Sequence, residues 1–274
     1  GFIALRRLNN AEAAERHFQA VGRDSTSVIT RARSAYWEGR ALAARQDMRR
    51  ARERWATAAG FPVAFYGQLG ALALGEPAPR IAQRINAVAQ APVTRDRQAA
   101  FNDSEMARVV RTLADLGDTR RARVFLLRIE DMARGATDRA LAARLANAIG
   151  RPDHAVWIAR RAGADGVVLM PEGWPTPYNP PVASPERAVI FAITRQESNF
   201  DSEAVSGANA RGLMQLLPTT AQAVARRLNL RHQVGMLTSD PQHNLRLGAA
   251  YLDQMLDRYR GALAMAAAAD TAGP

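Results

Sequence analysis

Apolar and small side chains recur three and four residues apart over residues 1 to about 90. This spacing places them on one face of a helix, so it predicts a series of helices. Alanine and glycine in the pattern allow two helices to approach closely, as in stacked helix-pair repeats. A generic tetratricopeptide-like scaffold is the alternative, and the aromatic residues are expected in the core in either case. The positions that carry the pattern are Ala11, Ala14, Phe18, Val21, Ala35, Gly39, Leu42 and Ala43.

A second group of helices is predicted between about residues 102 and 163, after glycine and proline interrupt the pattern at 75–79. Side-chain oxygens can cap the free amides of a first helical turn, and glycine favours a helix end. We therefore expect helices over 106–116, 120–133, 138–149 and 153–161, with starts at Asp118-Thr119, Thr137-Asp138 and Pro152-Asp153 and stops at Gly117 and Gly150.

A proline-rich segment follows, because six of the chain's 14 prolines lie within residues 171–185. Proline removes a backbone donor and breaks helices, so this segment is predicted to be a stiff, extended strap. Trp174 and Tyr178 are candidates for sugar contacts, although pinning the strap to the surface is the role we favour. Ser184-Pro185-Glu186 predicts the start of the next helix, with proline at its first position.

That next helix carries the main candidate for chemistry, Glu197. Ile190, Ile193 and Glu197 lie three and four residues apart and therefore share a helix face. Burial disfavours the ionised form of a carboxylic acid and raises its pKa, which suits a general acid. The alternative is that Glu197 lies at the solvated end of its helix.

Composition narrows the fold class and the chemistry. The chain of 274 residues is 47% hydrophobic and rich in alanine, leucine and arginine, which favours an all-α fold. It contains no cysteine, which excludes disulfides, thiolate zinc sites and a cysteine nucleophile. His232 and His243, eleven residues apart, are expected at the surface, and none of the four histidines forms a metal or triad pattern. We expect no metal and no cofactor.

The charge suggests an acidic partner. Net charge is +11, and all 37 basic residues are arginine, which favours nucleic acid or an anionic wall polymer. The arginine runs alternate with alanine rather than aromatic residues, so solvated helix faces are favoured over nucleic-acid binding. No apolar run approaches the roughly 20 residues that cross a bilayer, so stable membrane insertion is not expected. No signal peptide is visible and residue 1 is not methionine, which suggests a mature or truncated piece.

Three ordered blocks of sequence around and after Glu197 make the functional prediction more specific. The first is Glu197-Ser198, with Ser206 nine residues after Glu197, the small turn Ala208 to Ala210, and Gly212-Leu213-Met214-Gln215. The second is Pro218-Thr219-Thr220-Ala221, and the third comprises Asp240-Pro241, Asn244, Leu247-Gly248-Ala249 and Tyr251-Leu252. Together they resemble the soluble lytic transglycosylases with a goose-lysozyme-like catalytic domain.

The resemblance implies three all-α domains. Residues 1–90 would be the C-terminal part of a helical superhelix, 91–170 a helical linker domain, and 171–274 a lysozyme-like catalytic domain. The family's last helices should follow the block at 269–274, so the catalytic domain is expected to be truncated at its C-terminus. Enzymes of this family act on peptidoglycan, so the resemblance also implies a periplasmic location and a glycan-strand partner.

The same resemblance implies a reaction with one carboxylate. Glu197 would protonate the leaving oxygen at the MurNAc–GlcNAc bond and then accept a proton from the sugar's own 6-hydroxyl, giving 1,6-anhydro-MurNAc ends. Asp201 is expected to hold local backbone amides rather than act as a second acid. Two alternatives remain open: a muramidase that uses water, and a non-catalytic glycan-binding scaffold.

Four further site residues follow from matched positions. Ser206 would hydrogen-bond the substrate acetamide or Glu197, Gln215 would bind sugar hydroxyls, and Leu217 would line the groove in place of the family's methionine. Asn209 replaces a glycine of the family's small turn, and asparagine tolerates a positive φ. Asp270, followed by Thr271, stands where the family has a tyrosine that positions the catalytic glutamate.

Overall fold

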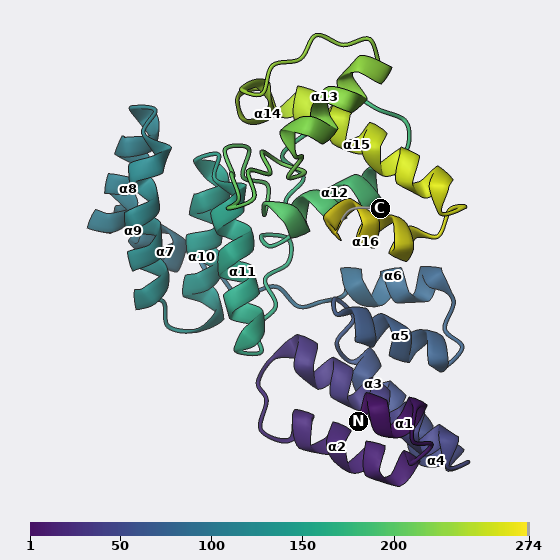
Figure 1. The fold of residues 1–274 in the computed structure, drawn as a ribbon. Coiled ribbons are helices and arrows are strands. Elements are labelled where there is room, and N and C mark those ends of the chain that lie inside the picture. Colours follow the sequence, from purple (N-terminus) through teal and green to yellow (C-terminus); the bar gives the residue numbers. More distant parts are fainter. Residues whose placement is uncertain (273–274) are drawn as a thin grey trace. The chain divides into compact units, whose positions relative to one another are not determined.

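The computed structural model describes the backbone of residues 1–272 and the side chains of residues 1–269. Within this part of the chain every regular element is an α-helix (Figure 1). The only extended pairing among these residues consists of two isolated β-bridges, Val205 with Arg211 and Arg211 with Leu216. The predicted all-α fold class is therefore confirmed.

The chain divides into two compact units, and the helices α9, α10 and α11 each contribute to both. Unit 1 comprises Gly1–Asn102, Glu130–Leu141 and Ile158–Gly173. Unit 2 comprises Asp103–Ile129, Ala142–Trp157 and Trp174–Pro274. The division into three domains stays a prediction.

Unit 1 begins with the predicted series of short helices, and its seams contain the small residues that the pattern indicated. A Cβ placed on Gly39 would lie 2.5 Å from the ring of Trp55, so α3 and α4 approach closely only because residue 39 is glycine. Tyr36 and Trp55 are buried in the same cluster, as expected. The helices are α1 (Phe2–Arg6), α2 (Ala11–Arg23), α3 (Val28–Ala44), α4 (Met48–Ala59), α5 (Phe65–Ala73), α6 (Ala78–Asn86) and α7 (Arg95–Asp103).

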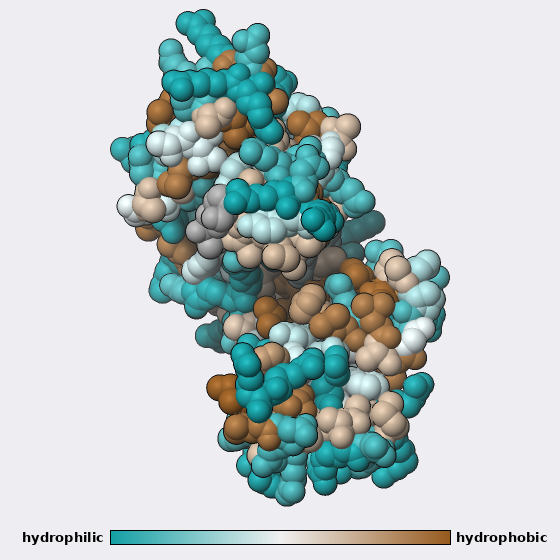
Figure 2. Space-filling model, turned by 45° about the vertical axis from the view of Figure 1, so that its right-hand side comes forward, coloured by the Kyte–Doolittle hydropathy of each residue, from teal (hydrophilic) through white to brown (hydrophobic). Residues whose placement is uncertain are grey.

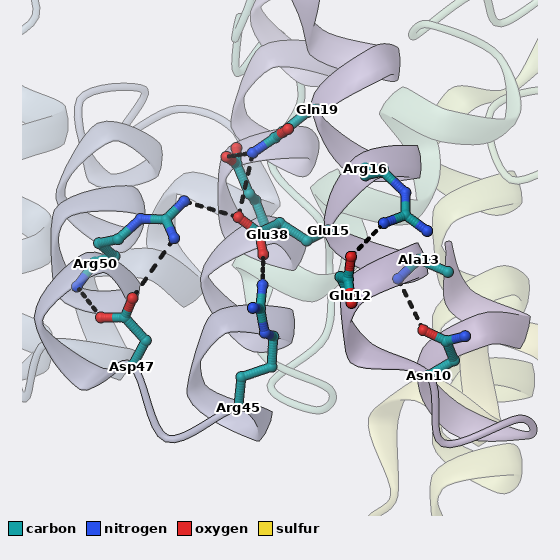
Figure 3. Close-up of polar contacts among 10 residues, drawn as sticks. All are labelled: Asn10, Glu12, Ala13, Glu15, Arg16, Gln19, Glu38, Arg45, Asp47 and Arg50. Carbon is teal, nitrogen blue, oxygen red and sulfur yellow. Dashed lines mark hydrogen bonds and ion pairs between the residues drawn. The ribbon is translucent and has the colours of Figure 1, made fainter.

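A buried carboxylate links three of these helices, as Figure 3 shows. Glu15 of α2 is only 6% exposed. Arg45, which caps the C-terminus of α3, and Arg50 of α4 both donate to it, the latter at 2.8 Å. Breaking a buried ion pair leaves an uncompensated charge, so these contacts specify how the helices pack.

The second helical group matches its prediction except at one helix start. It comprises α8 (Glu105–Asp115), α9 (Thr119–Met132), α10 (Gly135–Ala148) and α11 (Pro152–Ala164). Asp118 caps α9 by accepting from the amide of Arg121, and Gly117 and Gly150 have φ values of 77° and 75°. The predicted start at Thr137-Asp138 is wrong, because Asp138 accepts from the amide of Arg134 and the helix already begins at Gly135.

The proline-rich strap contains no helix from Trp174 to Glu186, as expected. The guanidinium of Arg195 lies 4.7 Å from the ring of Trp174, and Tyr178 packs against the core of unit 2. The next helix, α12 (Arg187–Glu197), starts later than Pro185. The predicted start is wrong because Glu186 has φ −51° and ψ 138°, outside the helical region.

The rest of unit 2 surrounds α12 with a core drawn from distant parts of the chain. Ile190 packs with Leu213, Leu245 and Leu252, all of them buried. The remaining helices are α13 (Pro218–Arg227), α14 (Met236–Ser239), α15 (Pro241–Arg258) and α16 (Leu263–Ala272). Hydrophilic residues cover most of the face shown in Figure 2, with smaller hydrophobic patches between them. Among residues 1–272, no helix combines the length and the apolar character that a membrane crossing needs.

Candidate active site

Glu197 is the last residue of α12, and it is half-buried. Ile190, two turns earlier on the same face, is fully buried, whereas Ile193 is half-buried. The two sequence interpretations therefore both describe part of the site, since the carboxylate follows a buried stripe and stands at a helix end. This is the position of a side chain that can meet a substrate while its helix stays anchored in the core.

The backbone turns sharply directly after Glu197. Asn199 and Phe200 have φ values of 53° and 72°, in the left-handed region that non-glycine residues rarely adopt. Phe200 is 2% exposed, and its ring meets that of Phe191 edge to face at 5.9 Å. The Ser198 hydroxyl donates to the carbonyl of Leu213 at 2.8 Å and accepts from the amide of Phe200. Ser198 therefore ties the end of α12 to the loop that carries the other predicted site residues.

Ser206 lies on that loop, which folds back on itself between residues 204 and 216. Its carbonyl accepts from the amide of Asn209, and its hydroxyl accepts from the amide of Ala210 at 3.0 Å. Asn209 has φ 65°, so it adopts the positive φ expected of the residue that replaces glycine. Ser206 is exposed, and the contacts that it accepts leave its hydroxyl hydrogen available to a ligand.

Gln215 and Leu217 lie on the same loop and play different parts. The Gln215 amide nitrogen donates to the carbonyls of Gly212 and Ala204, at 2.9 and 3.2 Å. These contacts hold the loop closed and engage the nitrogen of the Gln215 carboxamide, so a hydrogen bond from a ligand would have to be accepted by its oxygen. Leu217 is 43% exposed and precedes the first residue of α13. An exposed leucine next to the loop offers an apolar surface.

The residue that fixes this loop is Asn244 of α15, for which the sequence suggested no role. It is fully buried, and its side-chain oxygen accepts from the amide of Met214 at 3.0 Å. Its amide nitrogen donates to the carbonyls of Arg211 and Leu237, at 3.0 and 2.9 Å. All these partners are backbone groups at least seven residues away in the chain, so only the folded structure shows the contact.

Asp201 has the structural role expected of it. One carboxylate oxygen accepts from the amide of Glu203 at 2.9 Å and closes the turn after Phe200. Burial raises the pKa of Asp201 and the nearby carboxylate of Asp153 adds to the effect, whereas the Glu203 amide opposes it. The residue therefore shapes the turn.

A polar cavity of about 210 Å³ lies next to this turn. Burial lowers the pKa of His154, one of its lining residues, to about 4. Arg123 donates to Nε2 of His154 at 3.0 Å, which places the proton of the neutral ring on Nδ1. The other lining residues are Arg151, Asp153, Trp157, Ser198, Asn199 and Asp201.

The prediction that His232 and His243 are surface residues is wrong for His243. That ring is 8% exposed, and its Nε2 lies 2.9 Å from Nδ1 of His232. Asp240 caps α15 through the amide of His243, which draws this residue into the first turn of the helix. Burial lowers the pKa of both histidines.

Asp270 lies on α16, but its side chain is outside the described residues, and so is its predicted place in the groove. In the part of the chain whose side chains are described, acidic, histidine and cysteine residues form no cluster of three that could hold a metal.

The region that contains Glu197 and the loop is similar to known proteins. The family model described as "Transglycosylase SLT domain" matches residues 183–274. Residues 183–274 are thus similar to a transglycosylase SLT domain. The match covers α12 and the whole loop from Ser206 to Leu217, so the resemblance to the soluble lytic transglycosylases is confirmed.

Two curated proteins are similar to part of the chain in sequence. A "Putative soluble lytic murein transglycosylase" of Haemophilus influenzae is 41% identical over 87 residues, which are 32% of this chain and 15% of that protein. A "Membrane-bound lytic murein transglycosylase C" of Serratia proteamaculans is 35% identical over 82 residues, 28% of this chain and 22% of that protein. The chain thus matches less than a quarter of the length of either.

Solved structures extend the similarity beyond the SLT domain. An inactive mutant of the lytic transglycosylase Slt from Pseudomonas aeruginosa is 26% identical, with a TM-score of 0.77 over 98% of this chain and 43% of that one. The 70 kDa soluble lytic transglycosylase of Escherichia coli is 22% identical, with a TM-score of 0.70 over 99% of this chain and 45% of that one. The second likeness shows the all-helical fold.

Proposed function

We propose that this chain is a peptidoglycan lytic transglycosylase. It would cleave the β-1,4 bond between MurNAc and GlcNAc without consuming water and leave 1,6-anhydro-MurNAc ends. The observation that carries the proposal is the SLT domain at 183–274, within which Glu197 ends a core-anchored helix. Ser198 couples that helix end to the loop of Ser206 and Gln215.

Glu197 would act first as an acid and then as a base. It would donate its proton to the bridging oxygen as the bond to the anomeric carbon of MurNAc breaks. The sugar's N-acetyl oxygen would stabilise the positive charge on that carbon. The ionised Glu197 would then accept the proton of the sugar's 6-hydroxyl, while the oxygen of that hydroxyl bonds to the anomeric carbon. One proton leaves Glu197 and one returns, so the residue ends as it began.

The remaining predicted site residues have supporting roles in this proposal. Ser206 would donate its hydroxyl hydrogen to the substrate acetamide or to Glu197. Gln215 would accept from sugar hydroxyls through its carboxamide oxygen, because its nitrogen holds the loop. Leu217 would offer an apolar contact, and Asp270 would stand in the tyrosine position of the family.

The location and partner follow from the same proposal. Peptidoglycan lies outside the cytoplasmic membrane, so the chain would act outside the cytoplasm, and we propose the periplasm. The partner would be a glycan strand. One solved relative, 21% identical with a TM-score of 0.71, is a complex of the 70 kDa soluble lytic transglycosylase with bulgecin A.

The decisive experiment replaces Glu197 in the chain and analyses the products from purified sacculi by mass spectrometry. Glu197→Gln should lower the cleavage rate by about 10²–10⁴-fold, the usual contribution of general acid–base catalysis. Glu203→Gln is the matched control, because Glu203 lies on the turn after Phe200, is exposed, and pairs at 3.0 Å with Arg120 of α9. It should cleave at a normal rate.

Each rival has its own result. Reducing MurNAc ends in place of anhydro ends would establish a muramidase. Binding of glycan without cleavage by the unaltered chain would establish a scaffold. Near-normal turnover by Glu197→Gln would remove Glu197 from the mechanism. The inactive state of the Pseudomonas aeruginosa relative, which carries glutamine in place of a glutamate, supports the choice of this variant.

A further inference from the structure

Two helices of unit 2, α12 and α13, end in the same way, but the backbone conformation one residue later differs between them. After α12 the residue Asn199 has φ 53°, and after α13 the residue Asn229 also has φ 53°. Asparagine in the left-handed conformation is an ordinary way to end a helix. The chain then returns to negative φ at Leu230, whereas Phe200 is left-handed as well, with φ 72°. Of the two residues that follow these asparagines, Phe200 and Leu230, Phe200 is therefore the one with the unusual backbone conformation.

A phenylalanine is a poor choice for this backbone conformation on local grounds. Its Cβ meets the neighbouring carbonyl at positive φ, and unlike asparagine it has no side-chain dipole to relieve the contact. Such residues persist only where the surrounding structure holds them, and they gather at functional sites. The reason for Phe200 must therefore lie in what its ring contacts.

The ring of Phe200 belongs to a core to which both α12 and the loop contribute. It is buried with Ile190 and packs against Phe191, both of which belong to α12. It also shares that core with Leu213 and Met214 of the loop. These two elements carry Glu197 and Gln215, the two side chains at the centre of the candidate site.

The backbone around the ring is held as well. The amide of Phe200 donates to the Ser198 hydroxyl, which donates to the carbonyl of Leu213. The amide of Asp201 donates to the carbonyl of Ser198 at 3.0 Å. Since α12 ends at Glu197, a shift of these residues would move the carboxylate relative to the loop.

We propose that Phe200 is a positioning residue for Glu197. Its buried ring keeps the left-handed turn closed and so fixes the carboxylate of Glu197 against the loop of Ser206 and Gln215. In this role Phe200 acts through the position of Glu197 and not through contact with the substrate. This inference rests on the proposed function, because it assigns Phe200 a part in the same reaction.

The test compares Phe200→Leu with Leu230→Val, since each shortens the apolar side chain that follows a left-handed asparagine. Leu230 packs on a separate cluster around α13. Phe200→Leu should lower kcat at least tenfold on sacculus strands and leave KM within about twofold, because a misplaced acid slows the chemical step more than binding. Leu230→Val should lower the Tm and leave kcat per folded molecule within about twofold.

Three results would overturn the proposal: an unchanged kcat in Phe200→Leu, an equal loss of kcat in both variants, or a loss confined to KM. If Phe200→Leu does not fold, Asn199→Ala and Asn229→Ala replace the pair. Each variant disturbs a left-handed asparagine with φ 53° at a helix end, and both keep the Phe200 ring. Because only Asn199 lies in the turn next to Glu197, kcat should fall only for Asn199→Ala.

A second readout separates this inference from the proposed function. If the unaltered chain cleaves nothing, the proposed function fails, but the position of Glu197 can still be observed by NMR. The carbon-13 shift of its carboxylate should change in Phe200→Leu and stay constant in Leu230→Val. An identical shift in wild type and Phe200→Leu would show that the ring does not position the carboxylate.

Discussion

At the scale of single residues, the chain shows how a substitution within a motif can keep the backbone that the motif needs. Asn209 stands in the small turn where the related family has glycine, and it adopts φ 65°. Its neighbours close the turn through the amide and hydroxyl of Ser206. Asparagine is among the few non-glycine residues that tolerate this region, so the change is compatible with the loop.

His154 predicts how stability depends on pH. Its folded pKa of about 4 lies below the ordinary value of 6.5, because burial disfavours the charged ring. The folded state therefore binds fewer protons than the unfolded state between these values. The stability contributed by the neutral ring is complete above about pH 6.5 and is lost as the pH falls towards 4.

His154→Gln should remove this component. Between about pH 7.5 and pH 4.5 the wild type should lose more unfolding free energy than the variant, since glutamine does not take up a proton. Urea titrations at several pH values would measure the difference. Parallel pH curves for the two proteins would show that His154 is not the group responsible.

At the scale of elements, the candidate site depends on α15 as much as on α12. Asn244 holds three backbone groups of the loop and of α14, and Gly212 makes room for it. A Cβ on Gly212 would lie 2.0 Å from the carbonyl of Leu237 and 2.3 Å from the Asn244 amide. The loop shape is therefore specified by a helix that lies some 30 residues further along the chain.

Asn244→Ala should destabilise unit 2 and slow cleavage. It removes the side-chain partner of the Met214 amide and of the Leu237 carbonyl. The Arg211 carbonyl still accepts from the Leu216 amide at 3.2 Å. Each buried group left unpaired costs about 1–3 kcal/mol. We expect a loss of about 3 kcal/mol or more in the free energy of unfolding, measured by calorimetry. Asn86→Ala, at the exposed end of α6, is the control and should change stability by less than about 0.5 kcal/mol. An equally small change in Asn244→Ala would contradict the role assigned to that residue.

At the scale of the whole molecule, charge is the dominant property. The net charge is +11, because the chain has 37 arginines, no lysine and 26 acidic residues. Peptidoglycan, the proposed substrate, carries carboxylates on its lactyl groups and stem peptides, so attraction between exposed charges should contribute to its binding. Such attraction is screened by salt, since the Debye length falls from about 10 Å at 0.1 M to about 3 Å at 1 M.

Binding to sacculi should therefore weaken at least tenfold between about 0.1 and 1 M salt. Co-sedimentation with the Glu197→Gln variant would measure this without digestion of the polymer. Chitin, an uncharged polymer of N-acetylglucosamine, is the matched control, and its binding should change little. If salt affected both polymers equally, charge would not be the basis of the interaction with the wall.

The sequence by itself determined the all-α fold class and the resemblance to the family, and it predicted the residues of the candidate site. Periodic apolar positions, capping residues and glycine stops report local geometry, so they predicted α9 and the ends of α8 and α10 closely. The ordered blocks from Glu197 to Tyr251 predicted the family, because the type and spacing of their residues are specific. Helix starts were less accurate at α10 and α12, which begin at Gly135 and Arg187 rather than at the predicted Thr137-Asp138 and Pro185.

The tertiary structure alone decided the contacts between residues distant in the chain. Asn244 meets a loop 30 residues earlier, His243 meets His232, and Phe200 accepts a left-handed backbone because its ring is buried between α12 and the loop. Local propensity opposes the last of these and says nothing about the other two. Burial and long-range hydrogen bonds outweigh local preference only after the chain has folded, so no pattern of neighbouring residues could reveal them.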